Sequence, residues 1–282
     1  MNAATIRPRS RALVAALCAC AATLASCVAF QAERMAEPVP EIAPGLLKGY
    51  LPISSLPNSA ALLPPPPAPG SAALALDEDV NRRALALRGS PRWGLAAEDA
   101  NLKFPQAAGT FSCALGTEIS AEATPTLYVL LRRTLADAGL STSAAKKQYN
   151  RPRPFLANRQ PTCSPGDEAF LAKDGAYPSG HAALGWAWAL ILTQISPENA
   201  DALLARGLAF GQSRVVCNVH WQSDVAEGRL MGAAAVARLQ SDPAFRADLE
   251  SAQRELRDAR SAQKKPVRDC SAEAAALEQR AP

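Results

Sequence analysis

The sequence predicts a single all-α domain, preceded by a signal peptide and a proline-rich segment. Helix caps followed by proline recur along the chain, leucines repeat with a helical period, and only residues 215–219 hint at a strand. The 282 residues are 48% hydrophobic and 20% charged, enough to bury one large core or two small ones. This composition excludes collagen, coiled-coil and wholly disordered proteins.

Residues 1–26 have the layout of a secretory signal peptide. Three arginines precede an almost wholly apolar or small run over residues 12–25, as is typical of exported proteins. The sequence LASC, which ends at Cys27, resembles the lipobox of bacterial lipoproteins. We therefore expect a periplasmic protein held to the outer membrane by a lipid on Cys27. The alternative is a signal peptide cut a little later, which leaves a soluble periplasmic protein.

The charge balance does not favour a nucleic-acid partner. The formal net charge is +4, and three positive charges belong to Arg7, Arg9 and Arg11 in the leader, which has no acid, so the remainder carries +1. Nucleic-acid binders normally keep a basic excess. After the leader, no stretch reaches the roughly 18 uninterrupted apolar residues that a membrane span needs. We thus expect the protein to contact the membrane through the lipid alone. Whether it forms a homo-oligomer stays open.

Residues 27–70 are expected to form a proline-rich tether. Ten of the 23 prolines lie between Pro38 and Pro69, and such a composition cannot form a helix or a central strand. Two arrangements stay open. The segment is either an extended arm, or it packs over the folded domain through its apolar residues, Leu46, Leu47, Tyr50 and Leu51.

Residues 71–282 are expected to form the helical domain. Helices are predicted to begin at Pro125, Pro197 and Pro243, each preceded by a capping residue, and Gly139 is expected to end the first. Four leucines at helical spacing predict its buried face: Leu127, Leu130, Leu131 and Leu135. Its polar residues are expected to face water: Arg132, Arg133 and Asp137. The charged tail after about Arg254 is expected to be a solvated helix.

Four cysteines remain after the leader and Cys27, an even number in an oxidising compartment. Three pairings are available. We favour Cys163 with Cys217, because both flank the segments described next, which leaves Cys113 with Cys270. Free buried thiols are the alternative. No Cys-x-x-Cys spacing occurs and the two histidines are far apart in the sequence, so no metal site is expected.

Three segments contain both histidines of the chain, His181 and His220, beside Gly, Ser, Arg and Asp: residues 145–155, 177–186 and 211–224. Taken singly, each histidine would be read as a core imidazole with one hydrogen bond. Their shared surroundings point instead to chemistry.

The sequence PSGH precedes a predicted helix. The first amides of a helix have no partner within it, and the helix dipole is positive there, so the N–H groups of Ser179, Gly180 and His181 could hold an anion. A serine cap is also ordinary packing chemistry, so this feature alone is a weak indication.

Three fixed cations are candidates for binding an oxyanion: Lys146, Arg153 and Arg214. The prolines on both sides of Arg153 predict that the preceding helix ends near Asn150 and that Arg153 lies on a stiff loop. Arginine offers a planar fork for phosphate oxygens and lysine a point charge. The remaining basic residues here, Lys147 and Arg151, are expected to be a solvated basic face.

His220 and Asp224 are four residues apart, so on a helix they would share a face. A carboxylate that accepts the proton of one ring nitrogen leaves a lone pair on the other, which makes a histidine a base or a nucleophile. The alternative is a surface pair worth about 0.3 to 0.5 kcal/mol.

Together these pieces spell K-x6-RP, then PSGH, then SR-x5-H-x3-D. This pattern resembles the phosphatidic acid phosphatase type 2 superfamily, and within it the bacterial class A non-specific acid phosphatases. The resemblance extends from Leu63 to about Leu249, through LPPPP, LAAEDANL, GWAWAL and HWQSD. The lipobox and the long proline-rich segment depart from it. The matching residues are Lys146, Arg153, Pro154, Pro178 to His181, Ser213, Arg214, His220 and Asp224.

The resemblance implies an all-helical bundle and a broad-specificity acid phosphatase that acts on small phosphomonoesters, without a metal or cofactor, through a phosphohistidine. In that scheme His220 attacks phosphorus, Asp224 orients His220, and His181 protonates the leaving oxygen. The phosphate oxygens would be held by Lys146, Arg153, Ser179, the amide of Gly180, and Arg214. Because His181 must be protonated, activity is expected to fall as the pH rises through its pKa.

Two other functions share these residues. A vanadium-dependent haloperoxidase would place vanadate in the same cradle, with His220 as its ligand. A non-catalytic phosphate-binding lipoprotein would retain phosphate without turnover, and the intact pair of His220 and Asp224 argues against it. Membrane lipid phosphatases with this pattern need several spans, which this chain lacks.

Overall fold

The computed structural model describes residues 38–279 and 281, and Glu41–Pro282 form one compact unit. Its fold is all-α, as predicted, apart from one small antiparallel pair, β1 (Glu41–Ala43) and β2 (Leu46–Leu47). The helices are α2 (Ser59–Leu62), α3 (Ala72–Ala84), α4 (Pro91–Ala100), α5 (Ser112–Leu115), α6 (Pro125–Leu140), α7 (Ser143–Tyr149), α8 (Pro154–Asn158), α9 (Glu168–Leu171), α10 (Gly180–Ile195), α11 (Ala200–Val216), α12 (Gln222–Leu239), α13 (Pro243–Ser261) and α14 (Cys270–Glu278). Short 3-10 turns occur at Ile53–Ser55, Leu85–Leu87, Gln106–Phe111, Pro165–Asp167 and Pro197–Asn199.

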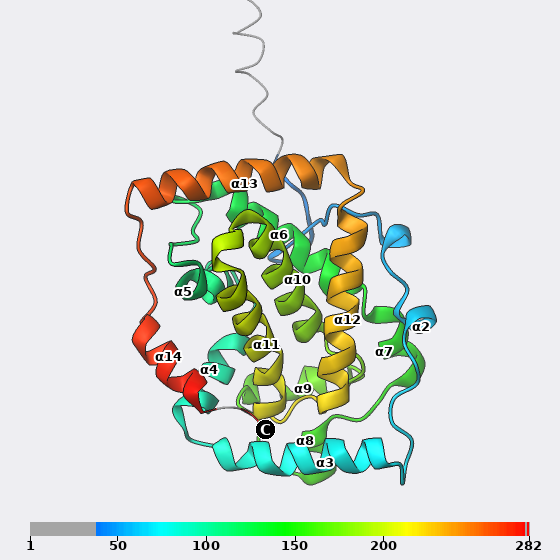
Figure 1. Ribbon diagram of the computed structural model, residues 1–282. Coiled ribbons are helices and arrows are strands. Elements are labelled where there is room, and N and C mark those ends of the chain that lie inside the picture. Colours follow the sequence, from blue (N-terminus) through cyan, green and yellow to red (C-terminus); the bar gives the residue numbers. More distant parts are fainter. Residues whose placement is uncertain (1–37, 280, 282) are drawn as a thin grey trace, which may run out of the picture. The chain divides into compact units, whose positions relative to one another are not determined.

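Helix α10 is the centre of the unit, and it packs against α6, α11, α12 and α13 (Figure 1). Its sequence is apolar all round, which is typical of a helix that neighbours cover on every side. The indole N–H of Trp188 is satisfied by the carbonyl of Leu131, 3.1 Å away on α6. A Cβ at Gly228 would lie 2.4 Å from the carbonyl oxygen of Ser179, so α12 needs glycine there to approach the start of α10.

Short connections join α10 to α11 and α11 to α12, so the three helices are successively antiparallel. The N-termini of α10 and α12 therefore lie at the same end of the unit as the C-terminus of α11 (Figure 1). Residues 215–219, which only hinted at a strand, do not form one. Val215 and Val216 form the last turn of α11, and the apolar run reflects burial on all sides.

The proline-rich segment packs onto the helices from Glu41 onward, which decides between the two arrangements left open and corrects the tether expected to extend to residue 70. Tyr50 and Leu51 belong to the main core. Their N–H groups each donate a 2.9 Å hydrogen bond to the carboxylate of Asp137. Asp137 is thus buried, and the expectation that it faces water is wrong, because this segment covers that face of α6. The leader and Cys27 lie outside the described residues.

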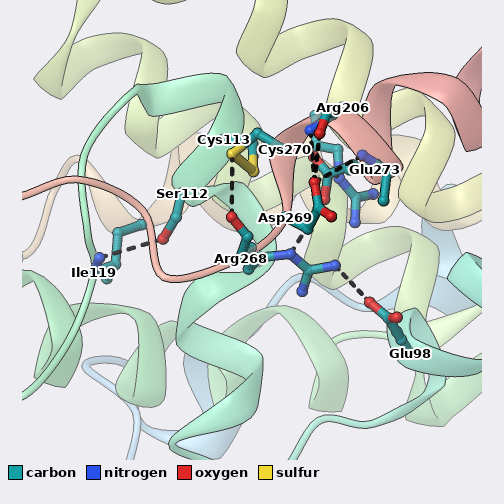
Figure 2. Close-up of a disulfide and its surroundings, with 11 residues drawn as sticks. Glu98, Ser112, Cys113, Ile119, Arg206, Arg268, Asp269, Cys270 and Glu273 are labelled. Atoms are coloured by element: carbon teal, nitrogen blue, oxygen red, sulfur yellow. Dashed lines mark hydrogen bonds and ion pairs between the residues drawn. A yellow bond between two sulfur atoms is a disulfide. The ribbon is translucent and has the colours of Figure 1, made fainter.

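Both favoured disulfides are present, Cys113–Cys270 and Cys163–Cys217. The first fixes α14 to α5 (Figure 2). Beside it, buried Glu273 lies 3.4 Å from Arg206 and 3.3 Å from Arg268 (Figure 2). The expectation of a solvated tail helix is therefore corrected: α13 and α14 each pack on the unit along one face and expose the other. The buried residues are Phe245, Ala252, Leu256 and Ala259 on α13, and Glu273 and Ala276 on α14.

Among residues 38–279 and 281, no helix combines the length and the apolar character needed to cross a membrane.

Candidate active site

Residues 145–155, 177–186 and 211–224, which contain the candidate histidines and cations, meet at the end of the unit where α10 and α12 begin. A cleft of about 790 Å³ opens there, with His181 and Arg214 in its wall. Other parts of the cleft are formed by the β1–β2 turn and by the residues that follow α4. Its larger apolar lining residues are Leu46, Leu102, Phe104, Leu135, Phe170 and Leu171.

His220 lies in the loop between α11 and α12, not on a helix, so the expected sharing of a helix face with Asp224 is wrong. The pair nevertheless forms. Asp224 is in the first turn of α12, where its carboxylate turns back, accepts the N–H of Trp221 at 2.8 Å and lies 3.4 Å from Nδ1 of His220. An acidic side chain in the first turn of a helix satisfies an amide that has no helical partner.

The loop that carries His220 is fixed from several sides. Asn218 has φ of 64°, a conformation that asparagine tolerates. Its side chain accepts a hydrogen bond from Asn81 and exchanges hydrogen bonds with Asn158. The N–H of His220 donates to the carbonyl of Arg214 at 3.2 Å. The adjacent Cys217 is held by its disulfide. These contacts hold the backbone of His220 at the end of α11.

The proton on His220 is assigned by its neighbours. The guanidinium of Arg153 can only donate, and its Nη1 lies 3.0 Å from Nε2 of His220, so Nε2 is the acceptor. The ring proton is then on Nδ1, toward Asp224. Burial, with the positive charge of Arg153 next, holds the pKa of His220 well below its usual value. His220 is therefore a neutral imidazole with a lone pair on Nε2.

Lys146 and Arg153 converge as the sequence predicts. Helix α7 ends at Tyr149, and Arg153 caps α8 after an extended turn. Sequence reasoning missed Asp174, whose Oδ2 accepts from Nζ of Lys146 at 2.7 Å and from Nη2 of Arg153 at 2.9 Å. Burial, followed by repulsion from Arg153, lowers the pKa of Lys146. The signal that could have pointed to Asp174 is its place in the sequence, because it is an acidic residue shortly before the PSGH segment.

Arg214, in the last turn of α11, is only 1% exposed. Its Nε and Nη1 have no hydrogen-bond partner within residues 38–279 and 281. Burial and the neighbouring charge of Arg153 lower its pKa to about 10. A buried cation without a partner is costly, and a bound anion would remove that cost. The positive charges of Lys146, Arg153 and Arg214 also lower the pKa of both histidines. The electrostatic field of these three cations therefore acts on the whole site.

The start of α10 differs in part from the expectation. The N–H of Ser179 donates to the carbonyl of Asp224 at 2.9 Å, so it is not available to an anion, and its Oγ accepts from the N–H of Ala182. The hydroxyl proton of Ser179 remains for a ligand. A Cβ at Gly180 would lie 3.6 Å from the side chain of Thr142, which is an ordinary contact distance. The neighbouring protein atoms therefore leave room for a side chain at this position.

His181 stacks on Phe210 and its Nε2 lies 3.1 Å from the carbonyl oxygen of Ala100. A carbonyl only accepts, so Nε2 carries a proton and Nδ1 is the nitrogen that can gain or lose one. Burial, with the charge of Arg214 next, holds the pKa of His181 well below its usual value.

Of the two basic residues expected to be solvated, Lys147 is exposed and Arg151 is not. Arg151 is 7% exposed, and its guanidinium bonds to the carboxylates of Asp77 and Asp224. Sequence spacing could not reveal this, because Asp77 lies in α3, more than seventy residues away. Ser213, another residue of the pattern, donates to Asp99 and does not line the cleft.

A comparison with protein families matches residues 126–244 to the PAP2 superfamily. The chain belongs to this superfamily. It is 46% identical over 202 residues to a non-specific acid phosphatase of Salmonella typhi, and the aligned region covers 71% of this chain and 81% of that protein. It is 44% identical over 208 residues to a non-specific acid phosphatase of Providencia stuartii (73% and 84%) and 40% identical over 204 residues to an acid phosphatase of Zymomonas mobilis (72% and 77%).

Proposed function

We propose that this protein is an acid phosphatase that transfers the phosphoryl group of a phosphomonoester to Nε2 of His220 and then to water. The main support is the neutral His220, whose Nδ1–H faces Asp224 and whose Nε2 faces the cationic cradle. The names of the relatives agree with this activity.

In the first step the N–P bond to His220 forms as the bond from phosphorus to the leaving oxygen breaks. Nδ1 of His181, when protonated, gives its proton to that oxygen. In the second step water attacks phosphorus, the N–P bond breaks, and His181 takes the proton from water. Asp224 stabilises the positive charge that His220 gains in between.

The cradle supplies the electrostatic part of catalysis. A loose phosphoryl transition state spreads negative charge over three equatorial oxygens, so fixed positive charges stabilise it. These oxygens are assigned to Lys146, Arg153 and the Nε and Nη1 atoms of Arg214, together with the hydroxyl of Ser179 and the amide of Gly180.

The test is to replace His220 by alanine. We expect turnover of p-nitrophenyl phosphate to be lost, because the nucleophile is gone, while circular dichroism shows the fold retained. Rapid quenching of the wild-type enzyme into alkali should trap an acid-labile phosphoprotein, and the variant should trap none. Wild-type activity should persist in chelator. Undiminished activity of the variant would reject the mechanism, and halide oxidation that requires vanadate and peroxide would favour the haloperoxidase instead.

We also infer that the protein is exported and held to the outer membrane by a lipid on Cys27. The charged and apolar leader and the LASC sequence support this, and two disulfides are typical of an oxidising compartment. Replacing Cys27 by serine should move the protein from the membrane fraction to the soluble fraction. Unchanged fractionation would count against the lipid anchor.

A further inference from the structure

A buried ionic network lies directly behind the Asp224–His220 pair. Nη1 of Arg151 lies 2.6 Å from Oδ1 of Asp224 and 2.8 Å from Oγ of Ser223, and its Nη2 lies 2.8 Å from Oδ2 of Asp77. Asp77 also accepts the N–H and the hydroxyl of Ser223, at 2.8 and 2.6 Å. The members come from α3, from the turn after α7 and from the start of α12.

The network is arranged to hold Arg151 in one position. Both ends of its guanidinium have partners, and the ring of Trp221 lies 5.4 Å from its central carbon. The side chains of Asp77, Arg151 and Asp224 are 3%, 7% and 0% exposed. Removing one partner of a buried ion pair leaves an uncompensated charge, so each member depends on the others.

We propose that Arg151, held by Asp77 and Ser223, is a positioning residue that keeps Asp224 ionised and aimed at Nδ1 of His220. This rests on the proposed phosphohistidine chemistry. Arg151 occupies Oδ1 of Asp224, which leaves Oδ2 for the Trp221 N–H and for the imidazole. It contacts no group assigned to the phosphate, and it therefore acts through Asp224.

The charge balance at Asp224 gives this role a measurable signature. Burial raises the pKa of Asp224 to about 6; Arg151 and the Trp221 N–H oppose the rise, and Asp77 adds to it. Without Arg151 the pKa of Asp224 goes higher, and the carboxylate is protonated at pH values where the wild type is ionised. The acid limb of the pH profile therefore moves to higher pH. The charged and titratable groups around the pair are Arg151, Asp77, Lys146, Arg153, His181 and Arg214.

The experiment compares Arg151→Gln, Arg151→Lys and Ser223→Ala with Lys147→Gln, a matched loss of positive charge at an exposed site on α7. We expect kcat of Arg151→Gln to fall on the order of tenfold to a hundredfold, by analogy with the loss of a partner that orients a metal-binding side chain. The acid limb should shift to higher pH, while KM and inhibition by inorganic phosphate change little. Arg151→Lys should restore part of both effects, and Lys147→Gln should match the wild type.

Adding Asp77→Asn to Arg151→Gln should move the acid limb back toward the wild type, because it removes the negative charge that raises the pKa of Asp224. If Arg151→Gln does not fold, Ser223→Ala should still show a smaller shift in the same direction. An unmoved acid limb in the folded variants, or a rise in KM as large as the fall in kcat, overturns the proposal. The wild-type enzyme is rapidly quenched into alkali in the same series of experiments. If it gives a trapped phosphoenzyme but the Arg151 variants show no effect, only the role of Arg151 is rejected. If the wild type gives no trapped phosphoenzyme, the phosphohistidine mechanism itself is rejected.

Discussion

The environment of His181 opposes the charge that its proposed role requires. Burial and the three cations hold its pKa well below the ordinary 6.5, so in the free enzyme the imidazolium is lost at a lower pH than for a free histidine. The negative charge of a bound phosphate acts in the opposite direction and raises the pKa of His181. The substrate therefore helps to protonate the acid that releases its own alcohol.

This argument predicts the pH dependence. The descending limb of kcat/KM, which reports the free enzyme, should lie below pH 6.5, and the corresponding limb of kcat should lie at higher pH. Pre-steady-state and steady-state rates measured from pH 4 to 8 would check both. A descending limb of kcat/KM well above pH 6.5 would exclude His181 as the group responsible.

The same residue gives a prediction on leaving groups. His181→Ala should lower turnover of an alkyl phosphate by roughly 10²- to 10⁴-fold, the usual contribution of general acid catalysis. The loss should be much smaller for p-nitrophenyl phosphate, because a stable phenolate leaves without a proton. Equal losses on the two substrates would show that His181 does not protonate the leaving oxygen.

At the scale of elements, the N-terminal segment and α6 depend on one another through Asp137. Its carboxylate receives the N–H groups of Tyr50 and Leu51, and a Cβ at Gly49 would lie 2.3 Å from its Oδ1. The β1–β2 turn, which precedes these residues in the segment, forms part of the cleft wall. The carboxylate of Asp137 is thus one of the contacts that fix the proline-rich segment on the helices.

Asp137→Ala should lower the free energy of unfolding by about 2 to 5 kcal/mol, because two buried N–H groups lose their acceptor. Gly49→Ala should act in the same direction from the other side of the contact. Urea unfolding followed by tryptophan fluorescence measures both, with Glu250→Ala, an exposed acid on α13, as the control. A change no larger than that of the control would mean that the segment docks without this contact.

At the scale of the whole molecule, local patterns predicted the helices that carry the site. Proline after a capping residue marked the starts of α6 and α13, and the apolar run after PSGH predicted α10. Local chemistry decides these features, since capping and periodicity act over one or two turns. The pattern of Lys146, Arg153, PSGH, Arg214, His220 and Asp224 predicted the family through its resemblance to known members.

The tertiary structure decided how charge is distributed among these residues. The sequence indicates that His220 and Asp224 belong together, but it does not show that Arg151 and Asp77 complete the pair. Nor does it show that two nitrogens of Arg214 find no hydrogen-bond partner in the described part of the chain. It also predicted a solvated Asp137 and a solvated tail, but Asp137 is buried and the tail packs on the other helices through four buried residues: Leu256, Ala259, Glu273 and Ala276. Whether a charged side chain meets water or another charge depends on segments that are distant in sequence, and only packing brings those segments together.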